Sequence, residues 1–371
     1  MRRGKCCSCC CLLEKSEKGI FMNHDRKKRF RICRCFSGVF LISIFIPTLF
    51  SAQTIWAGEK NYDLAVIYTQ EYKNSSRIDF FAEDKIGTET YRYANLCMLN
   101  ERVYDVNGNI YMAALGDSDS LDYSTILSYD PVSLAVEEYK FDRVNITDFQ
   151  IDGENIIVSS NLNWEFYLDR YNTRTGEMDS IQTSQMIGGF LSGQDVCYAV
   201  GEDLESYHSF LYQFDYESGE CKTICKLSDD TCQGYFDLAF YEQMLCVLFE
   251  QKIYCYNTVT GELTEKELCR NSPYQLRVFD EELYIIYSDP LSDSTDGNGV
   301  ERFDIQTMDS YEMFDYDGYI RQMEMKEDRI YILNYDCVEK YTLLDQALHL
   351  EQKYELEFTD EYYCGGMFVK W

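Results

Sequence analysis

The chain has 371 residues, with 64 Asp and Glu against 34 Lys and Arg and only 3 His, which gives a formal net charge of −30. A charge this negative argues against nucleic acid or an anionic lipid surface as the partner of the folded part. So few histidines exclude a His-rich metal centre and disfavour a Ser-His-Asp triad. We therefore predict no metal site, and we also predict no cofactor.

The first 58 residues predict a segment that directs the chain to a membrane. Residues 1–35 carry 11 Lys and Arg against three acidic residues, and residues 36–58 carry no charge. This pattern is typical of a transmembrane helix with its N-terminus in the cytoplasm, or of a cleaved signal peptide. Either alternative places residues 59–371 outside the cytoplasm. The protein would be a single-pass membrane protein, with membrane contact through residues 36–58 only, or it would be secreted.

Five cysteines between Cys6 and Cys11 stand apart from the rest of the basic leader. No second half-site follows them, so the cluster does not predict a zinc site. The alternative is that translation begins at Met22. Lys18-Gly19 can be encoded by a purine-rich stretch of the ribosome-binding type, and the segment from Met22 is an ordinary basic leader. This alternative also implies a bacterial source.

After residue 60, one turn signature recurs about every 43 residues. Its clearest copies are Tyr171–Glu177, Phe214–Glu220 and Tyr256–Glu262, which read aromatic, Asp or Asn, two variable residues, Thr or Ser, Gly and Glu. Asp or Asn folds its side chain back onto the backbone, and Gly takes the left-handed conformation that a bulged hairpin requires. Weaker copies begin at Tyr129, Phe303 and Tyr341. A fixed period of this length predicts stacked or radial repeats.

Each repeat divides into four short strands of alternating apolar and polar residues. The fourth repeat shows this best, with strands expected at 185–192, 195–201, 209–216 and 220–227. Four antiparallel strands in each unit of this length predict an all-β fold, a seven-bladed β-propeller. The first repeat lacks an innermost strand, and the chain ends with a surplus apolar strand at 362–370. We predict that this last strand completes the first blade and closes the ring.

These repeats resemble bacterial extracytoplasmic β-propellers of the quinoprotein-like and related families, whose blades also carry an Asp-x-x-Thr-Gly turn. The resemblance covers residues 60–371 and implies the architecture alone. The Trp that follows the turn in quinoprotein-type blades is missing here, where Met178, Lys222 and Thr264 stand nearby. The resemblance therefore does not imply quinone binding.

Aligning the predicted innermost strands places several polar residues in one layer around the central channel. Arg102, Asp148, Asp237 and Gln322 share that layer, and the remaining predicted binding residues flank it: Arg321, Tyr235 and Tyr319. Convergent polar groups rimmed by aromatic rings are typical of a ligand-binding mouth. The alternative is structural: Arg102 would pair with an acid across the channel, and the tyrosines would pack between blades.

Three functions remain open from the sequence. The first is a non-catalytic binding or scaffolding module that presents an acidic disc to a protein or a cell-wall glycan. The second is a glycan hydrolase or lyase that uses Asp148 and Asp237 as an acid and base pair. The third is a sensor, which the short cytoplasmic segment disfavours. We predict the first, with no catalytic residues.

Two further features concern cysteines and a loop. If Glu250-Gln251 forms a hairpin tip, Cys246 and Cys255 lie opposite each other, as a disulfide or as two buried thiols. The Asp-rich stretch 288–299 lacks the full calcium-loop pattern, and we interpret it as a long polar hairpin loop.

Overall fold

The computed structural model describes residues 61–371 except 71–72, 116–123, 142, 144, 194–195, 230–235, 290–296 and 359–360. The predicted leader and membrane segment, residues 1–58, lie outside the described residues. Among the residues that are described, no helix is long and apolar enough to cross a membrane. Strands dominate the described chain, with a single short 3₁₀ helix among them.

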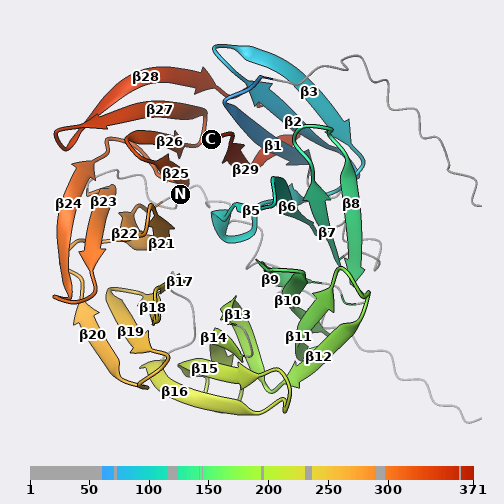
Figure 1. Ribbon diagram of the computed structural model, residues 1–371, viewed down its shortest axis with the longest axis vertical. Helices are drawn as coiled ribbons and strands as arrows, with labels where there is room; N and C mark the ends of the chain where they lie inside the picture. Colours follow the sequence, from blue (N-terminus) through green and yellow to red (C-terminus); the bar gives the residue numbers. More distant parts are fainter. Residues whose placement is uncertain are drawn as a thin grey trace, which may run out of the picture. The chain divides into compact units, whose positions relative to one another are not determined.

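The strands form seven antiparallel sheets arranged as the blades of a ring, which confirms the predicted seven-bladed propeller (Figure 1). From the inner to the outer strand, the first three blades are β29 (Tyr362–Val369), β1 (Leu64–Gln70), β2 (Ser76–Phe81) and β3 (Lys85–Tyr91); β4 (Leu96–Cys97) with β5 (Tyr104–Val106), β6 (Asn109–Ala114), β7 (Ser124–Tyr129) and β8 (Val136–Phe141); β9 (Ile146–Asp152), β10 (Asn155–Leu162), β11 (Glu165–Asn172) and β12 (Met178–Thr183).

The other four blades keep the same order. They are β13 (Gln185–Ser192), β14 (Val196–Asp203), β15 (Ser209–Asp215) and β16 (Cys221–Ser228); β17 (Phe236–Tyr241), β18 (Met244–Phe249), β19 (Lys252–Asn257) and β20 (Leu263–Glu267); β21 (Pro273–Phe279), β22 (Glu282–Tyr287), β23 (Gly299–Asp304) and β24 (Asp309–Asp315); β25 (Gln322–Lys326), β26 (Arg329–Leu333), β27 (Cys337–Leu344) and β28 (Ala347–Glu355).

The C-terminal strand closes the ring, as the sequence predicts. Strand β29 pairs antiparallel with β1 along its length, from Leu64 opposite Val369 to Gln70 opposite Tyr362. Gly365, at a bulge in this strand, accepts a 2.8 Å hydrogen bond from the Met98 amide of blade 2. A Cβ at residue 365 would lie 2.2 Å from the Leu96 carbonyl oxygen, so only glycine allows blades 1 and 2 to approach this closely.

The recurring turn owes its shape to side-chain hydrogen bonds. In the copy between β11 and β12, Oδ1 of Asn172 accepts hydrogen bonds from the amides of Arg174 at 3.1 Å and Thr175 at 2.9 Å. Gly176 then takes φ +73°, and its amide donates to the Asn172 carbonyl at 2.9 Å. The turn therefore depends on the Asn or Asp side chain and favours Gly at its left-handed position.

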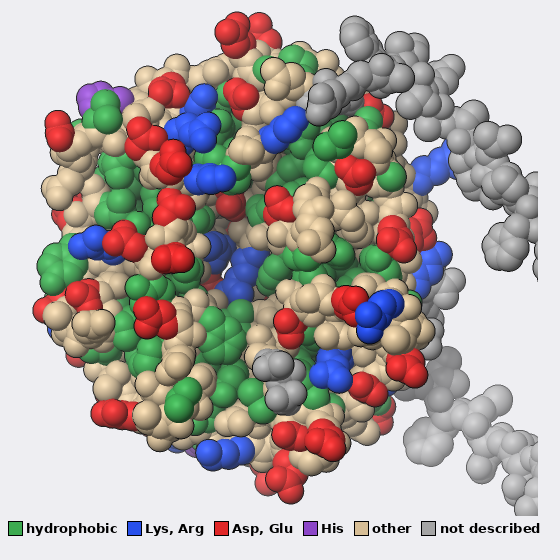
Figure 2. All heavy atoms as spheres, in the orientation of Figure 1, with side chains coloured by type: hydrophobic (Ala, Val, Ile, Leu, Met, Phe, Trp, Pro, Cys, Tyr) green, Lys and Arg blue, Asp and Glu red, His purple; other side chains and the backbone are tan. Residues whose placement is uncertain are grey.

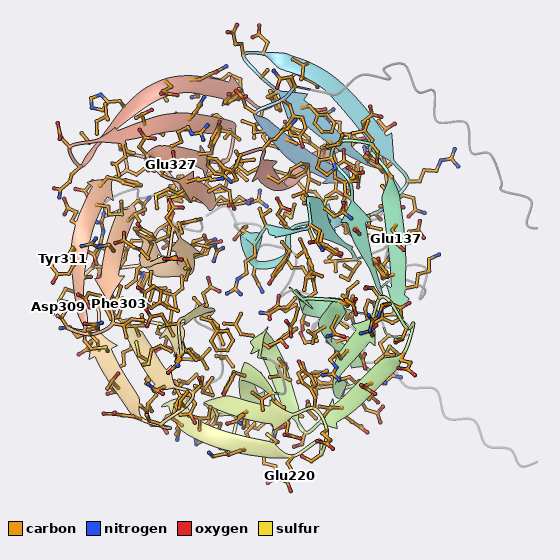
Figure 3. All side chains as sticks on the ribbon, in the orientation of Figure 1. Glu137, Glu220, Phe303, Asp309, Tyr311 and Glu327 are labelled. Atoms are coloured by element: carbon orange, nitrogen blue, oxygen red, sulfur yellow. The ribbon has the colours of Figure 1, made fainter. Side chains whose placement is uncertain are left out.

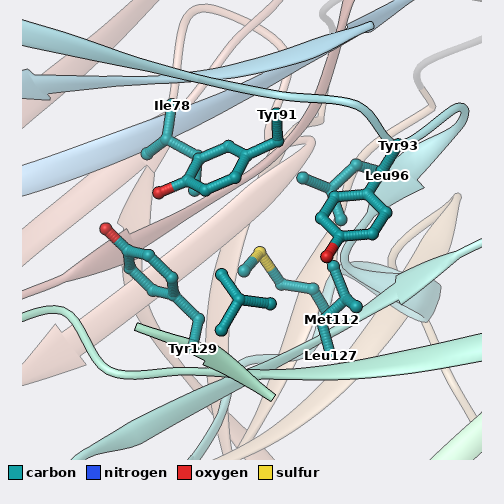
Figure 4. Close-up of a pocket in the computed structure, with 8 residues that line it drawn as sticks. Ile78, Tyr91, Tyr93, Leu96, Met112, Leu127 and Tyr129 are labelled. Atoms are coloured by element: carbon teal, nitrogen blue, oxygen red, sulfur yellow. The ribbon is translucent and has the colours of Figure 1, made fainter. Parts of the chain in front are cut away.

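Apolar side chains fill the spaces between neighbouring blades. Figure 4 shows one such contact, between blades 1 and 2, where Tyr91 and Tyr129 meet edge to face at 6.2 Å between ring centres. Ile78, Leu96 and Met112 pack against these rings and are almost fully buried. The contact is packed core with no room for a ligand.

Candidate functional site

The inner strand of blade 2 departs from the other six and places Arg102 in the channel. It is split into β4 and β5 by the 3₁₀ turn η1 (Leu99–Glu101), in which Asn100 and Glu101 take φ +52° and +51°. Aligning the repeats predicts the layer of Arg102 correctly but cannot reveal this interruption. We call Met98–Arg102 the plug segment, because its last three residues bond to blades 5, 6 and 7.

Arg102 forms its main contact with the opposite side of the channel. Its Nη2 donates to Oδ1 of Asp237 and to the Leu238 carbonyl, both in β17 of blade 5. Burial by itself lowers the pKa of Arg102, but the charges of Asp237, Tyr104 and Asp148 and the hydrogen bond to Asp237 together outweigh this effect, and the pKa is raised. Arg102 therefore pairs with an acid across the channel, as the structural alternative predicted.

A second arginine joins the same carboxylate to the plug segment. Arg277, in β21 of blade 6, donates from Nη1 to Oδ2 of Asp237 at 2.6 Å. Its Nη2 donates to the carbonyls of Asn100 at 2.9 Å and Glu101 at 3.2 Å. Asp237 thus holds two largely buried guanidinium groups, and the three side chains connect blades 2, 5 and 6.

Glu101 receives hydrogen bonds from blades 6 and 7. Its Oε2 accepts from the Tyr274 hydroxyl at 2.9 Å and from Nε2 of Gln275 at 3.0 Å, and its Oε1 accepts from Nε of Arg321 at 3.4 Å. Nη2 of Arg321 also donates to the Cys364 carbonyl of blade 1 at 2.8 Å. Arg321, predicted as a binding residue, therefore supports the contact between blades 7, 1 and 2.

The remaining layer residues join neighbouring inner strands through backbone amides. Asp148 of β9 accepts from the Phe190 amide at 3.3 Å, Asp237 accepts from the Leu276 amide at 2.9 Å, and Gln322 of β25 accepts from the Met367 amide at 2.9 Å. In each pair the acceptor lies in one blade and the amide in the next. Because buried amides need acceptors, this layer stabilises the ring.

Two carboxyl groups in the channel have strongly raised pKa values. Desolvation raises the pKa of Asp148 to about 7, although Arg102 and two backbone hydrogen bonds oppose the shift. Desolvation likewise raises the pKa of Glu324, in β25, to about 7, opposed by the Gln322 side chain and by Arg277. Both groups therefore change charge near neutral pH.

A hollow at the centre of the ring holds basic side chains, with acidic side chains scattered over the surrounding face (Figure 2). Side chains from the inner strands point into this space in Figure 3. The arginines of the channel identified by their contacts, Arg102, Arg277 and Arg321, are each bonded to Asp237 or Glu101. The channel is thus crossed by salt bridges between its own residues.

The predicted tyrosines have different positions. Tyr319 lies just before β25, half-buried, with its ring 5.0 Å from that of Tyr335 at an angle of 60°. Tyr235 lies outside the described residues. The sequence argument missed Glu101, Gln275 and Arg277. The sequence did contain a signal for them, since Glu101 precedes Arg102, and the same alignment of innermost strands places Leu276, between Gln275 and Arg277, in the layer.

The two cysteines of blade 5 lie opposite each other in the predicted register. Cys246 pairs with Cys255 between β18 and β19, and their sulfurs lie 3.8 Å apart as free, buried thiols. Across the part of the chain that the structure describes, no group of three or more His, Cys, Asp or Glu side chains could hold a metal ion.

Most of the Asp-rich loop, residues 290–296, is not described.

No protein-family model and no curated protein sequence matches this chain. Solved structures are similar in fold at low identity. A candidate 6-phosphogluconolactonase from Bacteroides uniformis has a TM-score of 0.57 at 8% identity, covering 83% of this chain and 99% of that one. A second candidate 6-phosphogluconolactonase, from Bacteroides fragilis, has a TM-score of 0.54 at 9% identity, covering 84% of this chain and 98% of that one. Dihydro-heme d1 dehydrogenase NirN has 0.51 at 14%, covering 81% of this chain and 65% of its own. These similarities concern the propeller fold.

Proposed function

We propose that this protein is a non-catalytic binding or scaffolding propeller outside the cytoplasm, anchored in the membrane or secreted, whose partner is a protein or a cell-wall glycan. The observation that carries the proposal is the occupation of the central layer. Asp148, Asp237 and Glu101 accept hydrogen bonds from amides or arginines of other blades. Because these residues bond the blades to one another, the ring can hold its surface loops rigidly.

The same contacts weigh against a hydrolase or lyase. A general acid and base pair needs two carboxyl groups that face a substrate and exchange protons with it. Both oxygens of Asp237 are bonded to arginines, and both oxygens of Asp148 accept backbone amides. Moving either carboxylate would break contacts between blades.

Charge supports an extracytoplasmic binding role. After residue 35 the chain carries 61 Asp and Glu against 23 Lys and Arg, whereas the leader is basic. This asymmetry agrees with a leader retained in the cytoplasm and an acidic domain outside it. Protease added to intact spheroplasts is expected to digest the propeller. Protection in intact spheroplasts, with digestion only after lysis, would contradict this location.

Binding without turnover can be tested with isolated cell walls. Full-length protein in mild detergent is sedimented with walls that retain their proteins, and with walls stripped of protein by protease. We expect co-sedimentation with at least one preparation and no release of soluble sugar fragments. Release of fragments would make the protein an enzyme, and absence from both pellets would exclude a cell-wall partner.

A further inference from the structure

Two large aromatic side chains occupy backbone positions that favour glycine. Trp164 takes φ +68° and is 67% exposed, and Tyr207 takes φ +57° and is 60% exposed. For residues with a Cβ, and above all for bulky ones, this left-handed conformation is unfavourable. Such strain persists where the surrounding structure or a function requires it.

Tyr207 stands in a turn that matches the recurring turn of the blades. Oδ1 of Asp203 accepts a hydrogen bond from the Ser206 amide at 2.8 Å, and the Tyr207 amide donates to the Asp203 carbonyl at 2.8 Å. The Asp215 turn forms the same two bonds, at 2.7 and 2.9 Å, with Gly219 in the equivalent position at φ +71°. Tyr207 therefore replaces the glycine that this geometry prefers.

Trp164 occupies the second position of the two-residue turn between β10 and β11. The preceding Asn163 has φ +55°, so both turn residues are left-handed. The turn before β6 has the same pattern with Asn107 at +57° and Gly108 at +82°. Asn followed by Gly is the favoured sequence for such a turn, and Trp is not.

Packing does not account for these two residues. Leu134 and Met308 also take left-handed φ values, +61° and +57°, but they pack against hydrophobic clusters between blades. Trp164 and Tyr207 are more than half exposed and belong to none of the hydrophobic clusters of the described residues. Their strain is therefore not offset by core contacts.

The two rings belong to equivalent loops of neighbouring blades. Trp164 joins the second and third strands of blade 3, and Tyr207 joins the second and third strands of blade 4. Because corresponding strands of a propeller run in the same direction, both loops lie on the same face. An exposed acid lies close to each ring in sequence, Glu165 directly after Trp164 and Glu205 two residues before Tyr207.

We propose that Trp164 and Tyr207 form a docking surface for a basic polypeptide segment of a partner protein, an inference that rests on the binding function proposed above. Charge complementarity selects this occupant, because an acidic protein attracts lysine and arginine and gives no such advantage to a neutral glycan. Indole and phenol faces attract cations. The chain uses this chemistry internally, since the Arg143 guanidinium lies 3.7 Å from the Tyr167 ring centre beside Asp169.

The test measures stability and binding in the same variants of the full-length protein. Trp164→Gly and Tyr207→Gly relieve backbone strain, so each is expected to raise Tm by about 1–3 °C. Together they are expected to weaken binding of a fluorescent hexalysine peptide about fivefold to tenfold at low salt, because two exposed cation–π contacts are lost. Leu134→Gly is the matched control, expected to lower Tm and leave peptide binding unchanged.

Each other outcome has a definite meaning. Peptide binding that survives the double change would overturn the docking surface while leaving a binding function elsewhere on the protein. A lower Tm for both glycine variants would show that the rings stabilise the fold, which also overturns the inference. Loss of binding to a chitin-type oligosaccharide, with hexalysine binding unaffected, would assign the surface to glycans. Cleavage of that oligosaccharide would instead contradict the proposed function.

Discussion

In the centre of the ring, Asp148, Asp237 and Glu101 are bonded to residues of other blades, whereas at the loop tips Trp164 and Tyr207 are exposed and their backbone is strained. The central residues are polar and convergent, which are usual features of a ligand site. Their contacts nevertheless serve the fold. Polar groups that converge in a repeat protein can thus be structural, and we base the binding proposal on the exposed, strained rings instead.

The largest effect is expected from removing the strand that closes the ring. Deleting residues 361–371 leaves β1 without its partner β29 and removes the carbonyls of Cys364 and Gly365 that blades 7 and 2 use. An exposed strand edge promotes aggregation. We expect insoluble protein or loss of a cooperative melting transition. An unchanged melting curve would refute closure by β29.

Removing the shared carboxylate should be the next largest effect. Asp237→Ala leaves Arg102 and Arg277 buried without their partner, which typically costs about 3–5 kcal/mol. Asp309→Ala is the control, because the Asp309–Lys266 ion pair is exposed and worth at most about 1 kcal/mol. Urea unfolding measures both. Equal losses of unfolding free energy in the two variants would show that Asp237 does not stabilise the ring.

The raised pKa values predict how stability depends on pH. Asp148 and Glu324 bind a proton more tightly when folded, so their contribution is complete below about pH 4 and is lost as pH rises through about 7. Each shift corresponds to a contribution on the order of 3 kcal/mol. In Asp148→Asn the unfolding free energy should therefore fall less between pH 5 and pH 8 than in the wild type. If the unfolding free energy changed with pH in the same way in both proteins, the raised pKa of Asp148 would be contradicted.

The smallest effects compare two turns of the same geometry. Gly219→Ala adds a Cβ that meets no atom within 4 Å, so its cost comes from the left-handed backbone alone, about 1 kcal/mol. Tyr207→Gly should shift stability in the opposite direction. Thermal unfolding of the two variants measures the direction of each change in stability. A gain for Gly219→Ala would show that φ does not control stability in these turns.

The fold could be predicted from the sequence because its information is local and repeated. Asn172, Gly176 and their counterparts mark each turn, and the missing inner strand of the first repeat identifies β29 as its replacement. The layer of Arg102, Asp148, Asp237 and Gln322 also follows from aligning repeats. Its role does not, because that role depends on partners 39 to 135 residues away.

Of the two irregular features, one was beyond sequence reasoning for a related physical reason, and the other could have been recognised. The 3₁₀ turn at Leu99–Glu101 breaks the repeat that the alignment relied on, and Glu101 gains its partners only when the ring closes. The left-handed Tyr207 could have been recognised by comparing Asp203–His208 with Asp215–Glu220. In that comparison Tyr207 stands at the position that Gly219 occupies in the regular turn.

The central claim is that charges crossing the channel hold the ring together, and a double-mutant cycle tests it most directly. The free energy of unfolding is measured for Asp237→Ala, Arg102→Met and the double variant. The account predicts that the double variant loses at least about 1.5 kcal/mol less than the two single losses combined, because Arg102→Met removes a charge that Asp237→Ala leaves unpaired. Additive losses, within about 0.5 kcal/mol, would show that the two residues act independently and would contradict the claim.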